Sequence, residues 1–231
     1  MAATLVAVLL AADRLAAFAV GLALAMGFCA RAPLEFRSRT GVLRPWDLAA
    51  LVIMGTLAAA GVVLAGGQRH AIWVLVLLAA ASLPVASAAA RNLRKHRHEL
   101  FELVGMTFLG ASGGLSAAAG GVSLRGALVV GVVMGFAAGT SVPLLRTELR
   151  RSAKRLTGAA VASVLAAFAV GALILWSLGQ PTAMLALVPR VISLPVRSLM
   201  MRSPPRPMVS GVREIVVAFS SAVILFAAMP G

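Results

Sequence analysis

Cysteine and aspartate are nearly absent from this 231-residue sequence. The single cysteine, Cys29, excludes an intramolecular disulfide and supplies no thiol pair for a metal site. The two aspartates, Asp13 and Asp47, lie far apart, so no aspartate-rich motif can bind a Mg²⁺-diphosphate. Walker A, nucleophile-elbow and zinc-helix motifs are missing as well. We therefore expect a protein without enzymatic activity, cofactor or bound metal.

Acidic residues are also scarce. The chain has 7 Asp and Glu against 21 Lys and Arg, which gives a net charge of +14 at pH 7. Such a balance is typical of nucleic-acid-binding proteins. Here aromatic residues form only 5% of the chain, and the basic residues lie in short stretches between apolar segments. We therefore expect no nucleic acid, and instead membrane lipids as partners, anionic on the cytoplasmic face.

Apolar residues dominate the composition. They form 61% of the chain, and the mean hydropathy of +0.98 exceeds what a soluble domain of this length can bury. The apolar runs are continuous rather than alternating, and most approach the roughly 20 residues with which a helix crosses hydrocarbon. The sequence predicts an all-α polytopic transmembrane bundle, one integral membrane domain over residues 1–231. Its eight expected spans are about 12–30, 48–66, 71–90, 100–122, 127–145, 157–178, 182–197 and 214–229.

Basic residues recur in four clusters, and a pair of apolar segments lies between each cluster and the next. The clusters hold 17 of the 21 Lys and Arg, whereas the other connections, near Gln68, Ser123 and Gln180, hold two. Loops beside membrane spans keep Lys and Arg on the cytoplasmic side. We therefore expect the clusters in the cytoplasm and both termini outside. The clusters are residues 31–44, 91–97, 146–155 and 197–213.

Small residues and prolines mark expected contacts and breaks in the helices. Gly131, Gly135 and Gly139 lie four apart on one face of the fifth expected span. Such a stripe lets two helix backbones approach closely, and we favour this interpretation over space for a ligand. Prolines inside or at the ends of spans should kink their helices. These prolines are Pro84, Pro143, Pro189 and Pro195.

A faint internal repeat is visible. A Pro-Leu pair with an arginine following it ends the first span at Pro33 and the fifth at Pro143, an offset of 110 residues. An acid eight residues after an arginine opens the fourth span at Glu99 and the eighth at Glu214, an offset of 115. Two four-helix halves in the same orientation would fit this pattern. Chance similarity of basic loops fits it equally well.

The densest group of ionisable residues lies at 91–102. On a helix, Glu99 and Glu102 share a face, and His98 lies one turn from Glu102. This grouping suits a metal or proton site at the cytoplasmic mouth. The simpler interpretation, which we favour, is two acids in the first turn of a span, where they suit the positive end of the helix dipole. Glu102 lies deeper in the apolar run, and an ionisable residue there is a functional candidate.

Arg190 follows Pro189 within an apolar stretch of the seventh span. If that helix ends early, the side chain can snorkel to the membrane surface. Alternatively, it faces the bundle and pairs with Glu102, Glu148 or an anionic ligand. The sequence leaves both possibilities open.

Charges at two further span ends are candidates for binding a lipid head group. Arg146 and Arg150, one helical turn apart, would suit a phosphate clamp. Glu148, between them, could pair with a neighbouring arginine instead. Arg213 and Glu214, before the last expected span, resemble this group. The simpler interpretation of all of them is membrane-surface charge.

Short motifs at the cytoplasmic ends of four spans resemble the YwiC-like family of bacterial membrane proteins. The resemblance implies a bacterial inner-membrane location and a helical layout like that of the UbiA prenyltransferase superfamily, whose bundle encloses a cavity for prenyl diphosphates. Members usually begin with a segment containing His-Gly-Ala-Trp, which this chain lacks, and the superfamily's enzymes need two aspartate-rich motifs, which it lacks as well. The motifs are Arg31-Ala32-Pro33-Leu34, Glu99…Glu102-Leu103-Val104-Gly105, Arg146-Thr147-Glu148-Leu149-Arg150 and Gly211-Val212-Arg213-Glu214-Ile215.

Three functions follow as hypotheses. The first is a non-enzymatic binder or carrier of an anionic or isoprenoid lipid, in which Arg146, Arg150 and Arg190 hold the head group and Glu102 orients one of them. The second is a small proton-coupled secondary transporter with Glu102 as the coupling acid. The third is an accessory subunit of a larger membrane complex, which would give the chain a membrane-protein partner.

Overall fold

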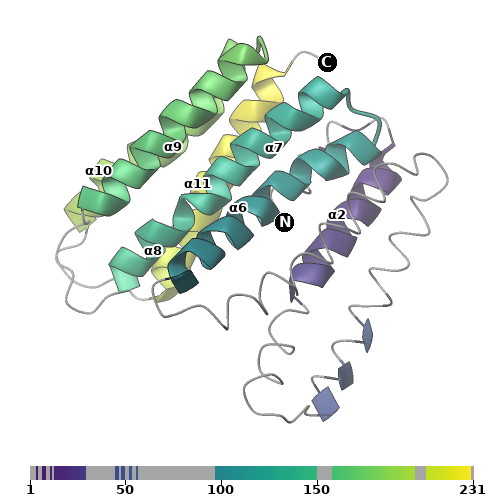
Figure 1. Cartoon of the computed structure of the whole chain (residues 1–231), viewed down its shortest axis with the longest axis horizontal. Helices are drawn as coiled ribbons and strands as arrows, with labels where there is room; N and C mark the ends of the chain where they lie inside the picture. The colour runs from purple at the N-terminus through teal and green to yellow at the C-terminus, as the bar shows by residue number, and fades with distance from the viewer. Residues whose placement is uncertain are drawn as a thin grey trace.

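A computed structural model describes residues 13–29, 97–149, 158–200 and 207–229, with scattered positions between 4 and 56. Within these residues every regular element is a helix (Figure 1). The expected span at 71–90 lies outside the described residues, as does most of the one at 48–66. The helices are α2 (Arg14–Cys29), α6 (Arg97–Ala119), α7 (Leu124–Gly139), α8 (Ser141–Leu149), α9 (Gly158–Ser177), the 3₁₀ helix η1 (Pro181–Leu187), α10 (Val188–Met200) and α11 (Pro207–Ala228).

Four stretches of helix among the described residues are long and apolar enough to cross a membrane. The all-α class is therefore confirmed for the described residues, which include helices of the length and composition expected of membrane spans. α2 and α6 coincide with the first and fourth expected spans but are not among the four. α2 has only 16 residues, and α6 is rich in glycine and serine. The four stretches are Leu124–Glu148, Gly158–Ser177, Pro181–Leu199 and Val209–Ala228.

The described helices run up and down the bundle, so the ends next to the basic clusters lie together (Figure 1). We call this end the basic end. It comprises the starts of α6, α9 and α11 and the ends of α8 and α10. Tight turns at 120–123 and 178–180 lie at the opposite end. The start of α2 also lies there, because the backbone N–H of Asp13 donates to the carbonyl of Gly120 at 2.9 Å.

α7 occupies the centre of the described bundle. Of its span, 61% is buried inside the protein, compared with 22% for the spans of α9 and α11. Val129, Val130 and Val133 of α7 are fully buried in the main core, which Leu187 of η1 and Leu225 of α11 complete. α9 and α11 instead expose large apolar side chains outward. This is the pattern of helices that face lipid rather than water.

The glycine stripe of α7 faces α6. At Gly131 and Gly135 an added Cβ would lie 3.3 Å from backbone oxygens of α6. The contact is tighter from the other side, because a Cβ at Gly110 or Gly114 of α6 would lie 2.2 or 2.3 Å from backbone oxygens of α7. At Gly139 it would meet the side chain of Thr107. The two backbones are therefore close enough to require glycine, as the four-residue spacing indicates.

The fifth expected span is interrupted between α7 and α8. Pro143 has no N–H to donate to the carbonyl of Gly139, and its ring crowds the preceding turn. The hydroxyl of Thr140 donates to the Phe136 carbonyl, and that of Ser141 to the Ala138 carbonyl at 2.6 Å. Side chains thus satisfy backbone oxygens at the break.

Two expected spans differ from the structure in their bounds. The segment at 182–197 is not one helix, because the chain runs as η1 and becomes α-helical only at Val188, just before Pro189. The last helix begins at Pro207 rather than 214. Proline suits the first position of a helix, where no N–H partner is needed. The earlier start places Arg213 and Glu214 inside α11.

We expect the two ends of α9 to lie on opposite sides of the membrane. In a Cys29→Ala background, Ser177→Cys should react with a membrane-impermeant maleimide in intact cells. Gly158→Cys, at the basic end, should react only after the membrane is opened. The reverse labelling pattern would show that α9 has the opposite orientation in the membrane. Labelling of both cysteines from outside would show that α9 does not cross the membrane.

Glycine replacements should separate packing from helix propensity. Gly114→Ala should lower the free energy of unfolding in detergent by about 1–3 kcal/mol, because its Cβ overlaps the α7 backbone. The matched control is Gly211→Ala, where nothing lies within 4 Å of the added Cβ. There alanine should be neutral or should stabilise by up to about 1 kcal/mol. Equal effects at both positions would contradict close contact between α6 and α7.

Candidate functional site

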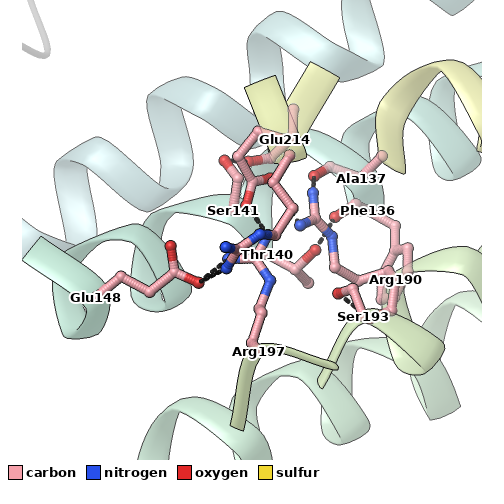
Figure 2. Close-up of polar contacts among 11 residues, drawn as sticks. Phe136, Ala137, Thr140, Ser141, Glu148, Arg190, Ser193, Arg197 and Glu214 are labelled. Carbon is pink, nitrogen blue, oxygen red and sulfur yellow. Dashed lines mark hydrogen bonds and ion pairs between the residues drawn. The ribbon is translucent and has the colours of Figure 1, made fainter. Parts of the chain in front are cut away.

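Five charged side chains from three helices form a connected ion network (Figure 2). Arg197 of α10 donates to Glu148 of α8 at 2.8 Å and also contacts Glu214 of α11. Arg190 of α10 donates to Glu214 at 2.7 Å. Arg213 of α11 donates to Glu148 at 3.1 Å. The network therefore ties α8, α10 and α11 together, and Arg197 is the residue that touches both acids.

The face that α10 turns inward explains how the arginines reach the network. Arg190, Ser193, Leu194 and Arg197 follow the i, i+3, i+4, i+7 spacing of one helix face, and all four are buried. Ile192 and Leu199, on other faces, are exposed. α10 is therefore polar toward the protein and apolar toward the outside, the reverse of a helix in a soluble protein.

Arg190 also contacts the break between α7 and α8. Its guanidinium donates to the carbonyl of Ala137, close to the C-terminal end of α7 (Figure 2). The helix dipole places partial negative charge at that end, which favours a cation there. Arg190 lies about 15 Å along α10 from Met200, at about 1.5 Å of rise per residue. Its charge is thus deep in a span, where Glu214 and a backbone carbonyl neutralise it.

Because the network is buried, its stability depends on how closely its positive and negative charges balance. Arg190, Arg197 and Glu148 are 0% exposed. Removing such charges from water is costly and is offset only by close pairing and satisfied hydrogen bonds. With all groups ionised, three arginines face two glutamates, an excess of one positive charge. Within the part of the chain that the structure describes, several buried polar atoms have no hydrogen-bond partner; these are Glu148 Oε2, Arg190 Nε, Arg197 Nε, Ser210 Oγ and Ser221 Oγ.

The structure brings together four of the site residues expected from the sequence. Arg190 is buried and does not snorkel, and its acidic partner is Glu214. Glu148 pairs with arginines, one of the two possibilities considered for it, and is buried rather than a surface charge. Arg213 and Glu214 belong to the same network, and both lie within α11.

None of the ion pairs given for the described residues of this network involves the remaining expected residues. Arg146 is half-buried on α8, two residues before Glu148, and residues two apart on a helix do not share a face. Arg150 lies outside the described residues. Glu99 and Glu102 lie in the first two turns of α6, at the basic end. Their side chains are outside the described set, so their pairing stays a prediction.

Arg197 was not among the residues singled out from the sequence. It stands at the edge of the last basic cluster and there resembles any charge beside a membrane span. The signal that identifies it is its spacing of seven residues from Arg190, with Ser193 between them. That spacing predicts a polar face on an otherwise apolar helix.

Comparisons with known proteins give no further assignment. No family model, no curated protein and no solved structure matches the chain. The resemblance to the YwiC-like family and the UbiA-like layout therefore stay predictions from the residues. Within the described residues, no three His, Cys, Asp or Glu side chains gather in a way that could hold a metal ion.

Loss of Arg197 should be the most damaging single change in the network. Arg197→Met takes a partner from the buried Glu148 and from the partly buried Glu214, and should lower the free energy of unfolding in detergent by about 3–5 kcal/mol. Arg213→Met is the matched control, because Arg197 still pairs with Glu148. Its side chain is 15% exposed, and we expect a loss of about 1 kcal/mol. Equal losses would contradict the central place of Arg197.

Proposed function

We propose that this chain is a non-enzymatic membrane protein that binds an anionic lipid, with the head-group phosphate at the basic end. The ion network carries the proposal. Among the described residues it has three guanidinium groups for two carboxylates. A largely buried excess of positive charge is costly unless an anion approaches.

Arg213 is the network residue best placed to meet a lipid phosphate. It is the most exposed of the three arginines, with 15% of its side chain accessible, against 0% for Arg197 and 1% for Arg190. It lies about 9 Å along α11 from Pro207, near the basic end, at about 1.5 Å of rise per residue. Guanidinium groups suit phosphate oxygens because they donate two hydrogen bonds in one plane.

In this proposal the three arginines of the network have different roles, which follow from how deeply each is buried. Arg213 makes the first contact with the phosphate, and Arg197 lies behind it on the shared acid Glu148. Arg190 is engaged by Glu214 and the Ala137 carbonyl. In this proposal Arg190 therefore holds α7, α10 and α11 together, in place of the ligand role expected from the sequence. The basic clusters beside α8 and α11 attract anionic lipid to the same end.

A second candidate function is secondary transport. Two of the four candidate spans depart from a regular α-helix, one at the turn residue Thr140 between α7 and α8 and one where η1 passes into α10 at Val188. Both of these spans contribute to the ion network. Broken helices that meet at intramembrane charges are the usual construction of a transporter's binding site. This observation supports transport of a small anion as the alternative.

Native mass spectrometry of the protein extracted gently from its own membrane tests the proposal. We expect a stoichiometric adduct of anionic-lipid mass, reduced about fivefold or more in Arg213→Gln because one phosphate contact is lost. The matched control is Arg14→Gln, the same change at an exposed position at the opposite end, which should leave the adduct unchanged.

Either of two results would contradict lipid binding. An adduct that survives Arg213→Gln as well as Arg14→Gln would separate the lipid from the network. A protein without an adduct would favour the transport candidate, which anion flux in proteoliposomes would then test. An adduct of isoprenoid mass would keep a lipid ligand but change its class.

A further inference from the structure

Only one of the two carboxylate oxygens of Glu148 accepts hydrogen bonds from the described residues. Its Oε1 accepts hydrogen bonds from both Arg197 and Arg213, at 2.8 and 3.1 Å. Its Oε2 is buried and accepts none. An ionised carboxylate offers about four lone-pair sites, and a buried charged oxygen without a donor is unfavourable. Oε2 can therefore accept a hydrogen bond from a donor other than the three arginines of the network.

The position of this oxygen connects it to the proposed phosphate contact. Oε1 and Oε2 belong to one carboxylate, and Arg213 donates to Oε1. The guanidinium of Arg213 therefore lies next to the carboxylate that carries Oε2. The site has two parts that differ in chemistry: a guanidinium for an anion, and beside it an acceptor for a hydrogen-bond donor.

We infer that the lipid head group is a phosphodiester that carries a hydroxyl next to its phosphate, as in phosphatidylglycerol. The phosphate lies on Arg213, and a head-group hydroxyl donates to Glu148 Oε2. This inference rests on the proposed function and adds to it the class of head group. Glu148 is then the residue that determines specificity, and Arg213 supplies affinity for any anionic phosphate.

The charge of the network favours a hydroxyl over an ammonium donor. An ethanolamine head group also offers a donor, but its ammonium cancels the phosphate charge. Its binding would leave the excess positive charge of the network unbalanced. A glycerol head group brings one negative charge together with a neutral donor, so it meets both requirements at once.

The test compares three lipids with identical acyl chains in exchange measurements on the delipidated full-length protein. Phosphatidylglycerol and phosphatidylmethanol carry the same phosphodiester charge, but only the first has head-group hydroxyls. Phosphatidylcholine has no net charge. We expect phosphatidylglycerol to be retained about tenfold better than phosphatidylmethanol, and phosphatidylmethanol better than phosphatidylcholine.

The outcomes separate the two proposals. Equal retention of phosphatidylglycerol and phosphatidylmethanol, with both above phosphatidylcholine, would overturn the hydroxyl contact and leave anionic-lipid binding intact. Equal retention of all three would overturn anionic-lipid binding itself. Stronger retention of phosphatidylmethanol would also overturn the hydroxyl contact.

A variant assigns the preference to Glu148. Glu148→Gln keeps a carbonyl oxygen for the arginines but replaces the free carboxylate oxygen with an NH₂ group, which is a donor. The preference for phosphatidylglycerol over phosphatidylmethanol should fall to about onefold in a protein that still retains both. If the preference persists in this variant, Glu148 is not the acceptor. The comparison of lipids on the unaltered protein stands even if the variant fails to fold.

Discussion

Pairing of buried charge is the interaction on which the basic end of this bundle depends. Two arginines on α10 are held within the protein, and their charges are balanced by one glutamate on α8 and one on α11. In the interior of a membrane protein neither partner can turn to water, so separating the helices would leave bare charges. The relative positions of α8, α10 and α11 are therefore set by electrostatics. Apolar contacts alone would allow these helices to slide along one another.

The rest of the described bundle is arranged around this constraint in two ways. Toward α6, the α7 backbone makes close contact through glycines, where steric fit decides the geometry. Toward α10 and α11, the break at Thr140 exposes carbonyl oxygens, and Arg190 occupies one of them. The same helix is thus fixed on one side by small residues and on the other by a cation that belongs to the ion network. A lipid bound at Arg213 would act on three helices at once through these shared partners.

The sequence predicted where the described helices lie more accurately than it predicted the residues at which they begin and end. Apolar runs near α2, α6, α7–α8, α9 and α11 indicated where helices lie, because hydropathy over some twenty residues is a local property. The division of 182–197 into η1 and α10 and the start of α11 at Pro207 were not predicted. In the second case Arg213 was taken as lying just before the last span and Glu214 as its first residue, whereas α11 begins six residues before Arg213. They enter the helix because opposite charges on α8 and α10 are there to meet them, and those partners are distant in sequence.

The candidate site was likewise predicted only in part. Arg190, Glu148, Arg213 and Glu214 were identified as unusual because ionisable residues are rare in or beside apolar spans. Pairing was one of the possibilities left open for Arg190 and Glu148, but their partners Glu214 and Arg197 were not predicted. Arg197 was overlooked because its role depends on which face of α10 turns inward.

By itself the sequence determined a helical membrane protein whose basic clusters adjoin alternate ends of its helices, because composition and charge spacing along the chain suffice for that. Only the tertiary structure decided which acid meets which arginine and left one oxygen of Glu148 unpaired. Those contacts join residues 17 to 65 positions apart, and they follow from the packing of whole helices rather than from any local pattern.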